Sequence, residues 1–276
     1  MTFTTLISSD ELAECLSDPA FAVAVVDCRF MLDDVTWGRR EYLKAHIPGA
    51  VYADLDHDLS SAKTGTNGRH PLPSPDALRA TFSKLGIGDG VQVIAYDQDN
   101  GMYASRLWWL LRWMGHDAVA VLDGGFAKWD GPVVSGDEHR APREFVGAPR
   151  EELLVEADAV LNSDWRLVDA RAPERYRGDV EPLDKVAGHI PGAVNYFYKQ
   201  NVDANGVFLP PEELRERLGA VVGDASPSNV VSYCGSGVTG AHNLLALEHA
   251  GLHGARLYAG SWSEWSSDPS RPVAKG

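Results

Sequence analysis

Short apolar runs of strand length alternate along the chain with segments of helical periodicity. The runs cover residues 23–26, 91–96 and 118–122 in the first half, and 167–168, 229–233 and 255–258 in the second. Uninterrupted apolar runs are typical of strands that are buried on both faces of a parallel sheet. The alternation therefore predicts an α/β fold, in which a central, mainly parallel sheet is flanked by helices.

Helix start signals support this pattern. Ser8 and Glu11 have the spacing of a capping box ahead of an apolar periodic segment, which predicts a helix beginning there. Ser74 precedes Pro75, the arrangement of a capping serine and a first-turn proline. A further helix is expected to begin at Pro210-Pro211.

The chain contains an internal duplication. Four sequence blocks recur in the same order: 26–29 (VDCR) as 168–171 (VDAR), 46–51 as 189–194 (HIPGAV in both), 93–97 (VIAYD) as 230–234 (VVSYC), and 124–129 as 260–265. The offset stays between 136 residues (Gly124 to Gly260) and 143 residues (His46 to His189). Such order and spacing indicate two homologous domains. We expect an N-terminal domain over 1–135, a linker over 136–150 and a C-terminal domain over 151–276, because the sequence around the linker is rich in Gly, Pro and charge without periodicity.

Composition excludes several classes of function. The chain carries 25 Lys and Arg against 39 Asp and Glu, a net charge of −14, which disfavours nucleic acid or an anionic membrane as partner. No apolar run approaches the length of a membrane span, and the N-terminus lacks the pattern of a signal peptide. The cysteines, Cys15, Cys28 and Cys234, are too few and too scattered for a disulfide framework or a zinc site. We expect a cytoplasmic enzyme without metal or cofactor.

The two halves differ at the end of a matched strand, where the first half has Asp97 and the second has Cys234. A loop containing three glycines, Gly235-Ser236-Gly237-Val238-Thr239-Gly240, leads from this cysteine into an expected helix over 241–247. Loop N–H groups and a helix N-terminus directed at sulfur stabilise a thiolate and any anion attached to it. Cys234 is therefore the candidate nucleophile, whereas Cys15 and Cys28 are expected in the core.

The paired HIPGA segments, the CGSGVT loop and the closing GSWSEW segment together resemble the two-domain rhodanese family of sulfurtransferases, over nearly the whole chain. The resemblance implies two rhodanese-like domains, of which the first is inactive. It also implies that Cys234 carries a persulfide between a small anionic sulfur donor and an acceptor, which would be a thiol, thioredoxin or cyanide. Asp97 at the matching position of the first half agrees with an inactive copy.

The uncharged loop is similar to that of the 3-mercaptopyruvate sulfurtransferases, so this donor is favoured over thiosulfate, which remains the alternative. The resemblance implies that Ser236 works with a histidine and an aspartate, which match His70 and Asp56. A relay through these groups would move a proton during carbon–sulfur cleavage. The loop residues expected to contact the substrate are Gly235, Gly237, Val238 and Thr239.

The family holds the donor carboxylate with two arginines, and one of them matches Arg175. The second should follow Glu181-Pro182, where this chain has Leu183, so we expect Lys185 or Arg177 to take its place, or else a broader donor preference.

Further expectations concern five residues within or beside these motifs. Arg171 has a twin in Arg29 and is expected to have a structural role, as are His46 and His189 in the repeated turns. Trp262 and Trp265 are candidates for the wall of the pocket, although Trp129 in the first half indicates that at least one tryptophan position packs in the core.

Two rivals come from other classes. A cysteine phosphatase uses a similar loop but requires an arginine six positions after the cysteine, where this chain has Gly240. A non-catalytic rhodanese-like module would have lost the cysteine in both copies, and Cys234 is retained.

Overall fold

The computed structural model describes residues 2–162 and 164–276. The chain divides into two compact units. The N-terminal unit contains Met1–Ser60, Pro73–Arg150 and Ala204–Phe208, and the C-terminal unit contains Ser61–Leu72, Glu151–Asp203 and Leu209–Gly276. The segment 61–72, which comes from the first half of the sequence, is thus part of the C-terminal unit. The linear boundaries at 135 and 150 stay a prediction.

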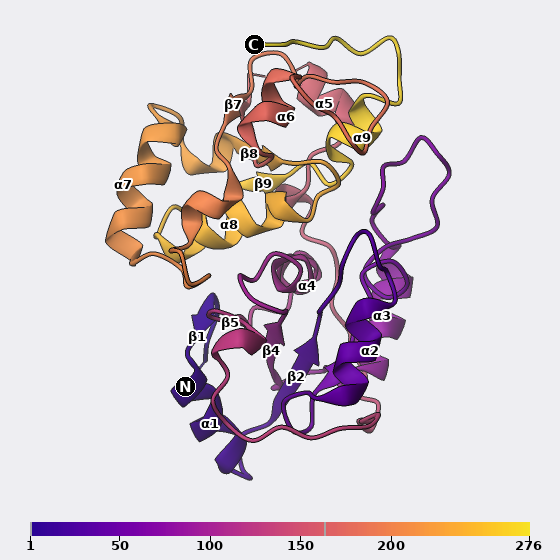
Figure 1. Cartoon of the computed structure of the whole chain (residues 1–276), viewed down its shortest axis with the longest axis vertical. Coiled ribbons are helices and arrows are strands. Elements are labelled where there is room, and N and C mark those ends of the chain that lie inside the picture. The colour runs from indigo at the N-terminus through magenta and orange to yellow at the C-terminus, as the bar shows by residue number, and fades with distance from the viewer. Residues whose placement is uncertain (1, 163) are drawn as a thin grey trace. The chain divides into compact units, whose positions relative to one another are not determined.

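The N-terminal unit is built on a five-stranded sheet with the order β1-β5-β4-β2-β3, in which every pairing is parallel. Its strands are β1 (Leu6–Ile7), β2 (Val23–Asp27), β3 (Val51–Tyr52), β4 (Gln92–Tyr96) and β5 (Val119–Leu122). The helices around it are α1 (Ser9–Ser17), α2 (Trp37–Lys44), α3 (Pro75–Lys84), α4 (Ala104–Trp113) and the short η1 (Phe126–Lys128) (Figure 1).

The C-terminal unit repeats this plan with a four-stranded parallel sheet of order β7-β6-β8-β9. Its strands are β6 (Arg166–Asp169), β7 (Val194–Asn195), β8 (Val230–Tyr233) and β9 (Arg256–Leu257). Its helices are α5 (Ala157–Leu161), α6 (Pro173–Arg177), α7 (Pro211–Val222), α8 (Thr239–His249) and α9 (Ser261–Trp265), with short turns η2 (Glu151–Leu153), η3 (Tyr198–Asn201) and η4 (Pro227–Asn229) (Figure 1). The expected α/β class with parallel sheets is confirmed.

Most of the expected elements lie where the pattern puts them. Ser8 and Glu11 form the complete capping box of α1, and the Ser74 hydroxyl accepts a hydrogen bond from the backbone N–H of Ala77 at the start of α3. The pattern missed β1, β3 and β7, which have two residues each, whereas the equally short β9 lies within the predicted run 255–258.

The stretch 136–150 packs along the N-terminal unit. Phe145 is buried edge-to-face against Phe82, with ring centroids 5.0 Å apart, and the Arg143 N–H donates to the Ser83 carbonyl over 3.0 Å. The expected linker is therefore held in place over part of its length.

The two remaining cysteines differ in burial. Cys28 is in the core as expected, and burial raises the pKa of its thiol well above the ordinary value. Cys15 is only partly buried and packs at the edge of a core cluster, so its placement in the core is only partly right.

The strand register is the same in both sheets up to the position that distinguishes the halves. Asp27 lies opposite Tyr96 in the first sheet, and Asp169 lies opposite Tyr233 in the second. The next residue, Asp97 or Cys234, thus follows the carboxyl end of the matching strand, where open α/β sheets bind ligands.

In the first copy the loop after the strand wraps a carboxylate. Asp97 is fully buried, and its two oxygens accept N–H bonds from four backbone groups, those of Asp99 (3.1 Å), Gly101 (3.0 Å), Tyr103 (2.7 Å) and Ala104 (3.2 Å). Burial raises the pKa of Asp97 to about 6, against the opposing effect of the N–H groups. The side chain is therefore mostly ionised at neutral pH, and its carboxylate is the acceptor for the N–H groups of this loop.

Replacing Asp97 with Ala should destabilise the N-terminal unit by about 2–4 kcal/mol, because four buried N–H groups lose their acceptor. Chemical denaturation followed by circular dichroism measures the loss, and Asp89→Ala, at an exposed position, is the control. Equal midpoints for the two variants would contradict the structural role of Asp97.

Candidate active site

Cys234 lies directly after β8, buried at the carboxyl end of the second sheet. Its Sγ accepts hydrogen bonds from the backbone N–H groups of Gly237 (3.1 Å) and Ser236 (3.4 Å). Burial alone would raise the pKa of this thiol, but the Thr239 hydroxyl and the loop N–H groups favour the thiolate and together hold the pKa below its ordinary value. The site therefore favours the nucleophilic form of the cysteine.

Helix α9 fixes the direction in which the loop peptides point. The N–H of Trp262 donates to the Cys234 carbonyl and that of Ser263 to the Gly235 carbonyl, both over 3.0 Å. The Cys234 N–H donates to the hydroxyl of Ser261 over 3.1 Å. Because α9 holds the carbonyls of Cys234 and Gly235, the loop keeps an orientation in which the N–H groups of Ser236 and Gly237 point to the sulfur.

The histidine expected from the sequence lies next to the loop. His70 and Ser236 are both buried, and His70 Nδ1 lies 2.7 Å from Ser236 Oγ. The segment that carries His70 is held to α9, since the Arg69 N–H donates to Ser263 Oγ over 3.0 Å. Two of the three expected relay groups are thus in contact within the C-terminal unit.

Asp56, the third expected member of the relay, belongs to the N-terminal unit. It lies in the turn after β3, where its N–H donates to Asp54 Oδ1 over 2.8 Å. Its part in a relay stays a prediction.

Two guanidinium groups flank Gly235. A Cβ atom built on this glycine would lie 2.5 Å from Nη2 of Arg69 and 3.5 Å from Nη1 of Arg175. A side chain at this position would therefore displace the Arg69 guanidinium. The sequence predicts Arg175 at this site but not Arg69, although Arg69 directly precedes the candidate relay residue His70. The loop itself has no charged residue, but two cations from other segments lie beside it.

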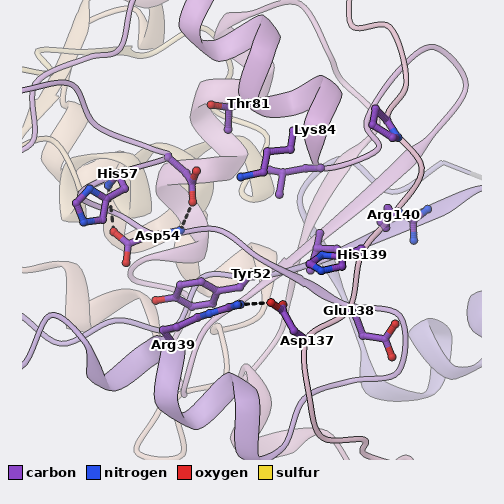
Figure 2. Close-up of a pocket in the computed structure, with 14 residues that line it drawn as sticks. Arg39, Tyr52, Asp54, His57, Thr81, Lys84, Asp137, Glu138, His139 and Arg140 are labelled. Atoms are coloured by element: carbon purple, nitrogen blue, oxygen red, sulfur yellow. Dashed lines mark hydrogen bonds and ion pairs between the residues drawn. The ribbon is translucent and has the colours of Figure 1, made fainter.

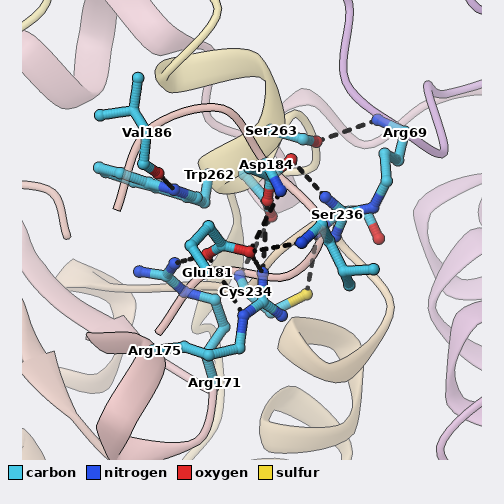
Figure 3. Close-up of polar contacts among 12 residues, drawn as sticks. Arg69, Arg171, Arg175, Glu181, Asp184, Val186, Cys234, Ser236, Trp262 and Ser263 are labelled. Carbon is cyan, nitrogen blue, oxygen red and sulfur yellow. Dashed lines mark hydrogen bonds and ion pairs between the residues drawn. The ribbon is translucent and has the colours of Figure 1, made fainter. Parts of the chain in front are cut away.

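Each guanidinium is paired with a carboxylate (Figure 3). Glu181 accepts from Arg175 over 2.6 Å and from Arg171 over 3.3 Å. Asp184 bridges the two site arginines: Oδ1 contacts Nη1 of Arg69, and Oδ2 lies 3.3 Å from Nη2 of Arg175. The cations beside the loop are thus held by neighbouring acids.

The two other candidate cations, Arg177 and Lys185, are exposed. Arg177 faces the surface and pairs with Asp179 over 2.8 Å. Lys185 is exposed and lines a cavity of about 470 Å³ that Arg69 and Asp184 also line. A role for Lys185 in binding the donor stays a prediction.

The remaining loop residues contribute backbone geometry. Gly237 has a φ of 78°, a conformation that favours glycine. Val238 is buried, and Thr239 begins α8. Contacts of these residues with a substrate stay a prediction.

The tryptophans that were expected to wall the pocket belong to the core instead. Trp262 and Trp265 are fully buried in the hydrophobic cluster of the C-terminal unit. The indole N–H of Trp262 donates to the Val186 carbonyl over 2.9 Å, and that of Trp265 to the Pro272 carbonyl over 2.9 Å.

The structural roles expected for the repeated residues are confirmed. Arg171 forms a buried ion pair with Asp169 over 2.6 Å. The Nδ1–H of His46 donates a hydrogen bond to the Tyr42 carbonyl over 2.7 Å, and that of His189 donates to the Tyr176 carbonyl over 2.8 Å. Each imidazole also stacks on the ring of the same tyrosine.

The N-terminal unit has a polar cavity of about 570 Å³ between α2, β3, α3 and residues 137–142 (Figure 2). Arg39 and Asp137 form an ion pair at its edge over 2.5 Å. Its lining consists of Arg39, Val51, Tyr52, Asp54, His57, Asp58, Thr81, Lys84, Leu85, Asp137, Glu138, His139, Arg140 and Pro142. None of the predicted site residues is among them.

No helix within residues 2–162 and 164–276 is long and apolar enough to cross a membrane.

A buried cysteine in an N–H-lined loop, at the end of a parallel strand in one of two repeated units, is the arrangement of two-domain rhodanese-like proteins. The family model for the rhodanese-like domain matches residues 8–131 and 153–268. The chain therefore belongs to the rhodanese family.

Individual relatives agree with this membership. The chain is 46% identical over 286 residues to a Pseudomonas aeruginosa protein named "Probable 3-mercaptopyruvate sulfurtransferase", with all of both chains covered. It is 40% identical to a Mycobacterium tuberculosis protein named "Putative thiosulfate sulfurtransferase SseB", covering 98% of this chain and 97% of the relative. The solved structure of SseA from Escherichia coli, titled as a 3-mercaptopyruvate sulfotransferase, matches with a TM-score of 0.80 and 32% identity over 94% of this chain and 99% of that one. The expected class, a sulfurtransferase of rhodanese fold, is confirmed.

Replacing Cys234 with Ser should abolish sulfur transfer and leave the fold unchanged, because a hydroxyl does not hold a transferable sulfur atom. Mass spectrometry after incubation with either donor should show one added sulfur atom in the unmodified protein and none in this variant. Cys28→Ser controls for loss of a buried thiol. Turnover near the unmodified level in Cys234→Ser would remove this residue from the mechanism.

Proposed function

We propose that the protein moves a sulfane sulfur from 3-mercaptopyruvate to an acceptor through a persulfide on Cys234. The observation that carries the proposal is the hydrogen bond of 2.7 Å between His70 and Ser236, beside the loop that holds the sulfur. A donor whose carbon must be protonated on leaving needs such a proton source, whereas sulfite leaves without one.

The first half-reaction transfers the sulfur atom from the donor to Cys234. The Cys234 thiolate attacks the donor sulfur, an S–S bond forms, and the C–S bond breaks with its electron pair passing to the carbon of the pyruvate enolate. Ser236 gives its proton to this enolate and regains one from His70, with Asp56 proposed to orient the imidazole. The products are pyruvate and the Cys234 persulfide.

The donor carboxylate is proposed to lie between Arg69 and Arg175. Both guanidinium groups reach Gly235, and a guanidinium binds a carboxylate through two parallel hydrogen bonds. The buried Nε of Arg69 has no hydrogen-bond partner in the part of the chain that the structure describes, so a donor group is available. The N–H groups of Gly235, Gly237, Val238 and Thr239 surround the transferred sulfur in this proposal.

Thiosulfate is the second candidate donor. Two guanidinium groups beside the loop suit a dianion as well as a carboxylate, and the relative from Mycobacterium tuberculosis is named for thiosulfate. The proposed acceptor is a thiol, thioredoxin or cyanide. The cytoplasmic location expected from the composition also stays a prediction.

Steady-state kinetics with cyanide as the common acceptor test the choice of donor. We expect the larger kcat/KM for 3-mercaptopyruvate. A larger value for thiosulfate would overturn the assignment of the donor while leaving Cys234 as the sulfur carrier.

Replacing Ser236 with Ala should lower kcat/KM for 3-mercaptopyruvate at least about 10-fold, since proton transfer by a positioned group contributes ~10²–10⁴. The value for thiosulfate should change by less than about 3-fold, because sulfite needs no proton from the relay. Ser226→Ala, at an exposed position whose hydroxyl lies 2.9 Å from that of Ser228, is the control. Equal losses for both donors would assign Ser236 to the shape of the loop.

Replacing Arg69 or Arg175 with Ala should lower kcat/KM for both donors. The loss of a charge-assisted contact should weaken binding of the transition state by about 2–4 kcal/mol. The same kinetic assay measures the effect, with Arg217→Ala as the control, because Arg217 pairs with Glu213 at an exposed position. Unchanged values in both variants would place the donor anion elsewhere.

A further inference from the structure

Asp184 bridges the two cations that face Gly235. Its carboxylate contacts Arg69 through one oxygen and Arg175 through the other. Only 7% of its side chain is exposed, compared with 24% for Arg69 and 16% for Arg175. A buried carboxylate of the chain therefore holds the groups that a donor anion would need (Figure 3).

The turn before Asp184 fixes its position. Glu181 Oε1 accepts the backbone N–H groups of Leu183 (3.1 Å) and Asp184 (3.2 Å). The same carboxylate also binds Arg171 and Arg175. The Glu181 carboxylate thus supports the turn and also binds two arginines. The Asp184 carboxylate, by contrast, contacts Arg69 and Arg175.

The charges beside the loop cancel. Three arginines, Arg69, Arg171 and Arg175, are joined in one ion-pair network with three carboxylates, Asp169, Glu181 and Asp184. The field that this network exerts on an incoming anion is consequently weaker than two guanidinium groups alone would give.

We propose that Asp184 is a specificity-determining residue, whose charge lowers the affinity of the site for anionic donors and does so twice as strongly, in free energy, for a dianion as for a monoanion. The inference rests on the proposed function for its donors. Coulomb energy is proportional to the charge of the ligand. Thiosulfate carries two negative charges and 3-mercaptopyruvate carries one carboxylate charge, so Asp184 disfavours thiosulfate.

The charges of the two donors set the expected change in kcat/KM. If neutralising Asp184 raises kcat/KM for 3-mercaptopyruvate by a factor f, the value for thiosulfate should rise by about f². For a partly exposed ion pair, f is about 3 to 10, so thiosulfate gains about 10- to 100-fold. The thiosulfate-to-mercaptopyruvate ratio therefore rises by about f, and the gain shrinks as ionic strength increases.

The test compares Asp184→Asn with Asp179→Asn. The control removes the same charge from a carboxylate that pairs with exposed Arg177 and has 55% of its side chain exposed. Steady-state kinetics with both donors and cyanide give f for each variant. A second measurement needs no turnover: unreactive sulfate and pyruvate should slow the alkylation of Cys234 by iodoacetamide, followed by mass spectrometry of the Cys234 peptide.

Asp184→Asn should strengthen protection by sulfate more than protection by pyruvate, and the control should leave both unchanged. Equal gains for monoanion and dianion would overturn the proposal, as would losses for both, which would make Asp184 only a support for the guanidinium groups. If the unmodified protein transfers sulfur from neither donor, the proposed function fails, and the protection assay still decides the effect of Asp184 on anions.

Discussion

The structure of each unit depends on a buried ion pair between an aspartate and the arginine two residues later. In the first unit Arg29 binds Asp27 over 2.6 Å and also donates to the Ala45 carbonyl, which joins the end of β2 to the repeated HIPGA turn. The Tyr96 hydroxyl donates to Asp27 over 2.6 Å. An isolated buried charge is very costly, and removing one partner of such a pair costs about 3–5 kcal/mol. The pair therefore specifies one arrangement of the strand ends, and the position that carries either Asp97 or Cys234 follows directly from it.

The second unit extends the same pair toward its reactive loop. Arg171 binds Asp169 and donates to the Gly188 carbonyl, as Arg29 does in the first copy, but it also contacts Glu181. Through Glu181 the structural pair is connected to Arg175, and through Asp184 to Arg69. The cations of the site are consequently oriented by groups whose own positions are fixed by the fold, and this kind of support preorganises a binding site.

What the sequence reveals depends on whether a property is periodic or repeated. Buried strands of four or five residues show an apolar run, and the duplication exposes Cys234 by contrast with Asp97, so these were predictable. His70 was found by its match to the family, and its contact with Ser236 followed. Arg69, one residue earlier, was missed because a side chain that approaches Gly235 from another segment leaves no local pattern. The tryptophans were misplaced for the opposite reason, since a residue in a conspicuous motif is often there for packing.

The two copies also show how one loop geometry serves two purposes. In both, the helix or turn after the last strand donates N–H bonds to the loop carbonyls: Phe126 to Asp97 over 2.8 Å, and Trp262 to Cys234 over 3.0 Å. The preceding residue has nearly the same φ, 58° at Gly125 and 55° at Ser261. Glycine adopts this conformation without strain, whereas serine does not. In the second copy Ser261 adopts this strained conformation. Its hydroxyl accepts a hydrogen bond from the Cys234 N–H and donates one to the Tyr258 carbonyl. Backbone strain of this kind persists where surrounding contacts over-determine it, and here those contacts hold the residue that bears the nucleophile.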